Sequence, residues 1–206
     1  MKNILYVILH GEIYKDRYKN IKETWGKNVD CIFYSDYDDK NVIKVSNRTD
    51  YRSNEEKHIK ILHYVNQNIK NYEWYFFCDD DTFVNTKKLS EYTITANKNL
   101  IHGSVLEGTW SIDKNLKYCS GGAGYLIHYT LLEQITKNLR ILKTGYSDVT
   151  LGIHLRNINV GLQDNIGFKS QNPSFFNIPI EDTTNYITFH YIKTYDEMLT
   201  LYNLIN

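Results

Sequence analysis

The chain has 206 residues, 42% of them hydrophobic and 23% charged, and its formal net charge is zero. This length is that of one sizeable domain, and the composition is that of an ordinary globular protein. A chain without net charge gives no electrostatic reason to bind nucleic acid or an anionic membrane surface, so we expect neither among its partners.

The cysteines and the N-terminal residues bear on the cellular compartment. Cys31, Cys78 and Cys119 are widely spaced and form neither a CxxC motif nor a Cys/His zinc spacing, so free thiols are expected. The apolar run at residues 3–9 is too short to span a membrane and lacks a cleavage-like tail. We therefore expect a soluble, cytoplasmic protein with no signal peptide, transmembrane segment or membrane anchor in this chain.

The first half of the chain alternates apolar runs of strand length with segments of helical periodicity. Strands are predicted at residues 3–9, 31–34 and 42–45 and in the run that begins at Trp74. Helices are predicted over residues 14–25, with Gly26 as the C-cap, and from Ser53 or Asn54 to about residue 69. This alternating order predicts an α/β domain with a largely parallel sheet and helices on both faces, and a nucleotide-binding-like half at residues 1–105.

The second half, residues 106–206, is less periodic. A strand is predicted at 100–105, at the end of the first half, and another at 187–192. Helices are predicted at 131–142, from an N-cap at Ser147 or Asp148 onward, and at 195–204. A turn of small residues at 118–124 leads into a short apolar run. No repeat or linker separates the halves, so we expect one domain over residues 1–206.

Three consecutive carboxylates, Asp79, Asp80 and Asp81, follow the aromatic run that begins at Trp74. Adjacent acids raise one another's pKa, and burying them unpaired costs several kcal/mol per ion, so a cation is expected beside them. The carboxyl ends of strands in an α/β sheet are also where ligands bind. A divalent metal held by oxygen ligands satisfies both conditions, and a solvated acidic turn is the alternative.

Four other features have an ordinary structural explanation when each is taken alone. The glycine-rich turn at 121–124 can reflect tight packing, and Asp148 can be a helix N-cap. His190 can be a hydrogen-bonded core histidine, and Arg17 can be a surface residue or a salt-bridge partner. No Walker-type loop and no GxGxxG motif after a strand is present, so the phosphates of a bound nucleotide would be met by a metal.

Five stretches occur together in a recognisable order: 17–26, 74–84, 118–125, 148–152 and 188–191. In this combination the sequence resembles the fringe and core-1 β1,3-galactosyltransferase group of inverting glycosyltransferases, which have a GT-A fold and use UDP-sugars. The resemblance covers nearly the whole chain. It departs in two respects: related animal enzymes have an N-terminal membrane helix and disulfides, and many relatives have an acid where this chain has Ser147.

The resemblance implies a donor and metal site. Asp81 would bind Mn²⁺ or another divalent cation directly, and His190 would be its second protein ligand. Asp80 would contact the donor sugar or the ribose, and Arg17 the nucleotide. Asp79 would be a supporting acid outside the metal ligands. From topology alone, contacts to the uracil of the nucleotide are expected from the first two strand ends, near His10 or residues 34–36.

The resemblance also implies how the sugar is transferred. Gly121 and Gly122 would let the donor sugar lie against the backbone, and Asp148 would be the catalytic base. The implied reaction moves a hexose or N-acetylhexosamine from UDP-galactose or UDP-N-acetylglucosamine to a hydroxyl of a glycan or glycoconjugate, forming a β1,3 linkage. The second half of the chain would then be the acceptor and catalytic half.

Two alternatives differ in class from this reaction. One is a catalytically silent sugar-nucleotide or glycan-binding protein that keeps the fold, against which the joint presence of metal ligands and base argues. The other is a metal-dependent phosphohydrolase, which lacks a nucleophile motif and enough ligands for two metals.

Overall fold

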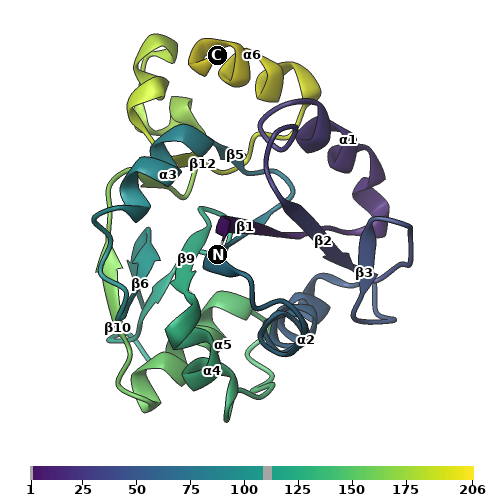
Figure 1. Ribbon diagram of the computed structural model, residues 1–206, viewed down its shortest axis with the longest axis vertical. Helices are drawn as coiled ribbons and strands as arrows, with labels where there is room; N and C mark the ends of the chain where they lie inside the picture. Colours follow the sequence, from purple (N-terminus) through teal and green to yellow (C-terminus); the bar gives the residue numbers. More distant parts are fainter. Residues whose placement is uncertain (1, 109–112) are drawn as a thin grey trace.

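The computed structural model describes residues 2–108 and 113–206. Within these residues a central seven-stranded sheet has the strand order β10-β6-β9-β4-β1-β2-β3 (Figure 1). Its strands are β1 (Lys2–Leu9), β2 (Cys31–Ser35), β3 (Val42–Lys44), β4 (Tyr72–Asp79), β6 (Leu100–Gly103), β9 (Tyr125–His128) and β10 (Gly161–Asp164).

The sheet is mostly parallel, as predicted. Strands β3, β2, β1 and β4 run parallel, β9 is antiparallel to both β4 and β6, and β10 is parallel to β6. The register places Leu9 opposite both Tyr34 and Asp79, so the carboxyl ends of β1, β2 and β4 lie level with one another. Residues that follow these strands therefore meet at one edge of the sheet.

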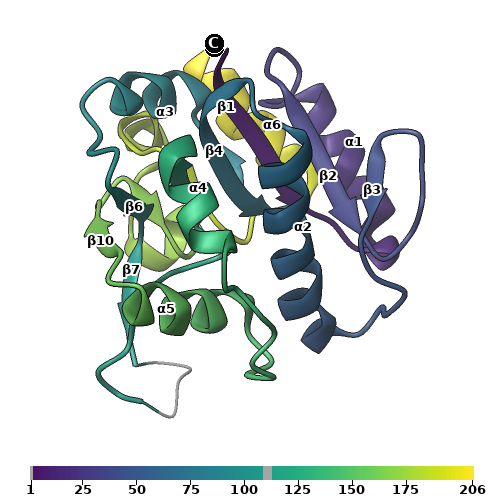
Figure 2. The same ribbon diagram turned by 60° about the horizontal axis from the view of Figure 1, so that its bottom comes forward.

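Helices cover both faces of the sheet because both faces are apolar. One face packs against α2 (Asn54–Asn68), α4 (Tyr129–Thr136) and α5 (Ser147–Asn157). The other packs against α1 (Lys15–Glu23), α3 (Thr86–Thr93) and α6 (Tyr195–Ile205). Figure 2 shows α2 and α4 in front of the sheet and α6 behind it. The aromatic side chains of β4 are almost fully buried between these layers, which explains its continuous apolar sequence.

Short elements complete the fold. A three-stranded sheet has the order β11 (Phe168–Lys169), β12 (Thr188–Phe189) and β5 (Phe83–Val84), and β7 (Val105–Glu107) pairs with β8 (Lys117–Cys119). The 3-10 helices are Glu12–Tyr14, Tyr51–Ser53, Pro173–Phe176 and Ile180–Asn185. Because β5 follows the three acids and β12 precedes His190, their pairing brings these distant parts of the chain together.

Several predicted helix ends need correction. The first helix ends at Glu23 with Thr24 as its C-cap, and the Gly26 N–H donates to the carbonyl of Ile21 at 2.9 Å. Ser53 is the N-cap residue of α2, as predicted, but its side chain makes no capping hydrogen bond. The predicted N-cap at Ser147 or Asp148 is wrong, because the N-cap of α5 is Tyr146.

Two predicted elements are much shorter than expected. The helix predicted at 131–142 ends at Thr136, because backbone N–H groups at Leu142, Lys143 and Gly145 donate to the Glu55 carboxylate. The strand predicted at 187–192 is reduced to β12, and Tyr191 takes a left-handed conformation with φ of 59°. The strand predicted at 100–105 is divided between β6 and β7.

Cys31, Cys78 and Cys119 are free thiols. Within 2–108 and 113–206, no helix combines the length and the apolar character needed to cross a bilayer.

Candidate active site

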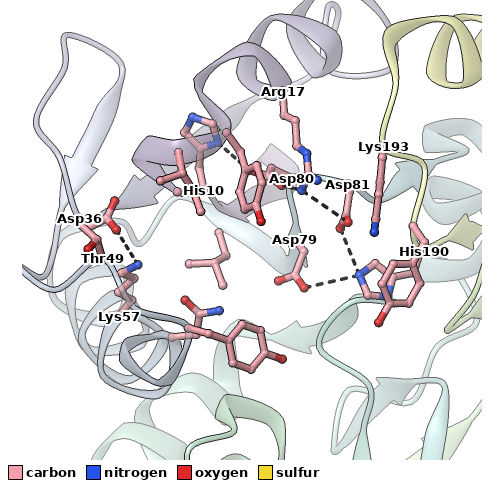
Figure 3. A pocket seen from close by; sticks show the side chains of 17 residues that line it. His10, Arg17, Asp36, Thr49, Lys57, Asp79, Asp80, Asp81, His190 and Lys193 are labelled. Carbon is pink, nitrogen blue, oxygen red and sulfur yellow. Dashed lines mark hydrogen bonds and ion pairs between the residues drawn. The ribbon is translucent and has the colours of Figure 1, made fainter.

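The three acids face a cavity of about 280 Å³ at the carboxyl ends of β1, β2 and β4 (Figure 3). Because the carboxyl ends of these strands lie level with one another, the side chains that follow them surround one space. Open α/β sheets bind their ligands at this end of the strands. Besides Asp79, Asp80 and Asp81, the polar side chains that line this cavity belong to His10, Tyr14, Arg17, Asp36, Thr49, Tyr51, Asn54, Lys57, His190, Tyr191 and Lys193.

Asp79, Asp81 and His190 form a group that can hold a metal ion, with ligand atoms all within 4.8 Å of one another. His190 Nε2 lies 3.1 Å from Asp81 Oδ1 and 3.7 Å from Asp79 Oδ2. His190 Nδ1 lies 3.3 Å from the carbonyl oxygen of Ser170, an arrangement that keeps a proton on Nδ1 and leaves Nε2 facing the acids, where it donates to Asp81 when protonated and can bind a metal when it is not. Carboxylate and imidazole ligands together suit Mn²⁺, so these residues fit a divalent cation.

This arrangement differs from the expectation for Asp79. The resemblance implied a supporting acid outside the metal ligands, whereas Asp79 offers a carboxylate oxygen to the same group as Asp81 and His190. The reason is local: Asp79 ends β4, and Asp80 and Asp81 lie in the turn that follows, which is closed by a hydrogen bond of 3.2 Å from the Thr82 N–H to the Asp79 carbonyl. The turn places the carboxylates of Asp79 and Asp81 beside His190, whereas Asp80 is directed at other residues.

Asp80 is almost fully buried and is held by two other residues. Its Oδ1 accepts a hydrogen bond from the Arg17 guanidinium at 2.8 Å, and its Oδ2 lies 2.7 Å from His10 Nδ1. Arg17 is also 3.5 Å from Asp81. Asp80 and Arg17, both predicted to contact the donor, therefore contact each other, and Asp80 fixes the guanidinium at the cavity wall (Figure 3).

The electrostatics of the group favour a bound cation. Burial raises the pKa of Asp79 to about 7, with the neighbouring carboxylates adding to the rise and His190 opposing it. Burial also acts on Asp81, but hydrogen bonding to His190 and the charges of Arg17 and Lys193 leave its pKa below the usual value. Burial alone would lower the pKa of His190, but the neighbouring carboxylates of Asp81 and Asp79 raise it by more, so the net shift is upward. A divalent ion would relieve the repulsion among the acids.

Asp148 lies at the second residue of α5 and does not line this cavity. Its Oδ2 accepts a hydrogen bond from the Gly121 N–H at 3.3 Å, and its Oδ1 from Val149 N–H at 2.9 Å. Burial raises the pKa of Asp148, and these backbone hydrogen bonds oppose the rise. A carboxylate with a raised pKa accepts a proton more readily than an ordinary one.

The glycine-rich turn connects Asp148 to His190. A Cβ atom at Gly122 would lie 2.1 Å from the His190 ring, so the imidazole occupies the space that a side chain would need. At Gly121 a Cβ would lie an ordinary 3.7 Å from the Cβ of Asp148. The turn is fixed by the Thr82 hydroxyl, which donates to the Gly122 carbonyl at 2.7 Å. Tight packing at a turn, the ordinary explanation, thus applies to Gly122, and the group packed against it is His190.

Two cationic residues in the cavity were not predicted. Lys57 on α2 makes a buried salt bridge of 3.0 Å with Asp36, which lies in the 34–36 segment expected to contact the uracil. Lys57 precedes the core residue Ile61 by four positions and so lies on the apolar face of the helix. This position was the signal in the sequence from which its burial could have been predicted. Lys193 follows His190 closely, and its amine points toward Asp81 (Figure 3).

A family model described as Fringe-like matches residues 7–204. The chain belongs to the Fringe-like family. A comparison with curated proteins gave no match. Together with the fold, membership in the family makes this protein a glycosyltransferase, an enzyme that takes a sugar donor and a glycan acceptor.

Solved structures similar to this Fringe-like protein are also glycosyltransferases. One is involved in the glycosylation of the major capsid of PBCV-1, with a TM-score of 0.60, 12% identity and coverage of 98% of each chain. GlyE of Streptococcus pneumoniae TIGR4 has a TM-score of 0.56 and 11% identity, over 93% of this chain and 55% of that one. The bifunctional glycosyltransferase WbbM has a TM-score of 0.55 and 13% identity, over 99% of this chain and 50% of that one. The fold is the GT-A fold, as expected.

Proposed function

We propose that this Fringe-like glycosyltransferase is metal-dependent and inverting. It transfers a hexose or N-acetylhexosamine from UDP-galactose or UDP-N-acetylglucosamine to a hydroxyl of a glycan or glycoconjugate, forming a β1,3 linkage. The observation that carries the proposal is the group of Asp79, Asp81 and His190 at the wall of the strand-end cavity, with Arg17 and Lys193 beside it.

The donor is bound by residues of both halves of the chain. Asp79, Asp81 and His190 would hold Mn²⁺ or another divalent cation, which when bound neutralises the charge that develops on the diphosphate leaving group. Arg17, fixed by Asp80 at 2.8 Å, supplies a further positive charge for the nucleotide. Most of the cavity wall comes from residues 1–105, which supports their assignment as the nucleotide-binding half.

Asp148 takes the proton from the acceptor hydroxyl as its oxygen attacks the anomeric carbon. The new carbon–oxygen bond forms on the face opposite the diphosphate, the bond to the diphosphate oxygen breaks, and its electron pair leaves with UDP. The raised pKa of Asp148 suits this role. The hydrogen bond from Gly121 orients the carboxylate, and the small residues of the turn leave room for the donor sugar.

Donor hydrolysis tests the proposal. The purified protein is incubated with a panel of UDP-sugars in Mn²⁺, in chelator, and in chelator followed by excess Mn²⁺. We expect UDP release with one sugar, only in the metal-containing samples. Metal-dependent binding without turnover, across varied acceptors, would instead identify a silent sugar-nucleotide-binding protein of the same fold.

A further inference from the structure

A second pocket, of about 230 Å³, adjoins the strand-end cavity. The side chain that the two spaces share is that of Tyr51, which lines both and is 70% exposed. The remaining lining residues are Arg52, Lys143, Thr144, Gly145 and Tyr146. The rings of Tyr51 and Tyr146 lie 6.4 Å apart at 72°, so two aromatic side chains form one corner of the pocket.

The pocket lies beside the proposed base. Its wall at residues 143–146 leads directly into α5, and Asp148 follows Tyr146 by two positions. Partial desolvation, together with the charges of Asp79 and Asp148, raises the pKa of Tyr51 to about 12, so both acids act electrostatically on this hydroxyl. A molecule in this pocket would be next to both the donor cavity and the base.

The wall of the pocket is anchored from beneath by Glu55, which is 2% exposed. Its carboxylate accepts hydrogen bonds from the N–H groups of Leu142, Lys143 and Gly145, at 2.7, 2.9 and 3.1 Å. The Thr150 hydroxyl of α5 donates to the same carboxylate at 2.8 Å. The loop and the helix that bears Asp148 are therefore tied to one buried group, and the pocket has a defined shape.

The exposed charges of the pocket are positive. Arg52 and Lys143 line it, and none of its lining residues is acidic. Within the described part of the chain neither Arg52 nor Lys143 forms a salt bridge, although surface cations elsewhere, such as Arg48 and Lys60, do. The negative charge of Glu55 is directed at backbone N–H groups of the wall, so it does not neutralise these cations.

We propose that this pocket is the acceptor subsite and that it takes a sugar bearing a carboxylate or phosphate group. This inference rests on the proposed transfer reaction and adds to it the chemical class of the acceptor. The exposed ring of Tyr51 provides an apolar face for the sugar, Arg52 and Lys143 bind its anionic group, and an acceptor hydroxyl is presented toward Asp148.

Binding of three matched probes tests the subsite: p-nitrophenyl β-glucuronide, p-nitrophenyl β-glucoside 6-phosphate and neutral p-nitrophenyl β-glucoside. Each is titrated into the full chain with and without UDP and Mn²⁺. We expect at least one anionic probe to bind at least about fivefold more tightly than the neutral one. The double variant Arg52→Gln, Lys143→Gln should remove this preference. The variant Lys137→Gln, Arg140→Gln, which removes two exposed cations outside the pocket, should keep it.

The two anionic probes distinguish a carboxylate from a phosphate ligand. Equal binding of all three probes, or a preference that survives the Arg52→Gln, Lys143→Gln change, would overturn the inference. Failure of the proposed transfer reaction has a different signature, because the same protein incubated with UDP-sugars and Mn²⁺ would then release no UDP. No metal ligand lines the second pocket, so its preference for anions is measurable in either case.

Discussion

Asp81 and Asp148 are both buried carboxylates, yet their surroundings shift their pKa values in opposite directions. Burial raises the pKa of Asp148, and backbone hydrogen bonds and the charge of His190 oppose the rise. Asp81 is hydrogen-bonded to His190 and close to Arg17 and Lys193, which together lower its pKa in spite of burial. Asp81 is thus kept as an anion suited to hold a cation, whereas Asp148 is suited to accept a proton.

Asp148→Asn tests this division of roles. We expect transfer to fall by at least about 100-fold, because the amide cannot accept the acceptor's proton. Mn²⁺-dependent UDP binding should stay nearly unchanged, since Asp148 is not among the grouped metal ligands. Transfer rates and calorimetric titration with UDP measure the two effects. Loss of UDP binding in this variant would show that the role given to Asp148 is wrong.

A pair of glycine substitutions tests the packing of His190. Gly122→Ala places a methyl group where the His190 ring lies, so the imidazole must move, and we expect Mn²⁺-dependent UDP affinity to fall by more than about tenfold. Gly121→Ala meets only ordinary contacts and is the matched control, with UDP affinity within about twofold of wild type. Similar affinities for the two variants would contradict the contact between Gly122 and His190.

At the scale of elements, the loop after α4 shows what local sequence patterns omit. Apolar Ile141 and Leu142 favour a longer helix in the sequence, but both are exposed, and the chain leaves the helix after Thr136. The buried carboxylate of Glu55, 87 positions from Leu142 along the chain, takes the N–H groups that a helix would use. Such a long-range interaction overrides helix propensity and is not visible in a local window.

Helix α3 was missed for a related reason. Its buried residues are Leu89 and Thr93 alone, a pattern too short to stand out, and its N-cap is Asn85, which accepts from the Lys88 N–H. The strands β1 and β4, by contrast, were predictable because their apolar runs are buried on both faces. Local burial patterns identify long elements, and short ones depend on partners elsewhere in the chain.

Glu55→Gln tests the anchoring role of this carboxylate. The amide brings N–H donors against backbone N–H groups and loses charge-assisted hydrogen bonds, so we expect the free energy of unfolding to fall by about 2 kcal/mol. Glu56→Gln, at the next position on α2, weakens ion pairs with the exposed cations Lys60 and Arg48 and should change stability by no more than about 0.5 kcal/mol. Urea unfolding gives both values, and equal losses would argue against a buried anchor.

At the scale of the whole molecule, the candidate site depends on contacts between residues far apart in sequence. The family resemblance implied that Asp81 and His190 would meet, and the structure brings them within 3.1 Å. The hydrogen bond between His10 and Asp80 was not predicted, because it depends on the parallel register of β1 and β4. The Lys57–Asp36 salt bridge was missed too, since it needs the packing of α2 against the sheet.

Global stability should depend on pH through His58, which is buried between the hydroxyls of Tyr34 and Tyr125. Burial lowers the pKa of His58 to about 3 in the folded state, against about 6.5 when unfolded. The unfolded chain therefore binds an extra proton between these values. The His58 contribution is complete above pH ~6.5 and decreases by about 1.4 kcal/mol per pH unit as the pH falls toward 3.

Comparison with His58→Asn isolates this contribution. Urea unfolding of both proteins at several pH values between about 4 and 7, in chelator, gives the two pH slopes. We expect a shallower slope for the variant, because it lacks the group that titrates on unfolding. Identical slopes would mean that His58 is not held neutral in the fold.

The central claim is that Asp81, with Asp79 and His190, holds the cation that binds the donor diphosphate. Calorimetric titration of UDP into the wild type and Asp81→Ala, each with Mn²⁺ and with chelator, tests it most directly, with thermal melts confirming that the variant is folded. We expect Mn²⁺ to strengthen UDP binding to the wild type and to have little effect on the variant. Equal, Mn²⁺-dependent UDP affinity in the two proteins would remove Asp81 from the site and contradict the account.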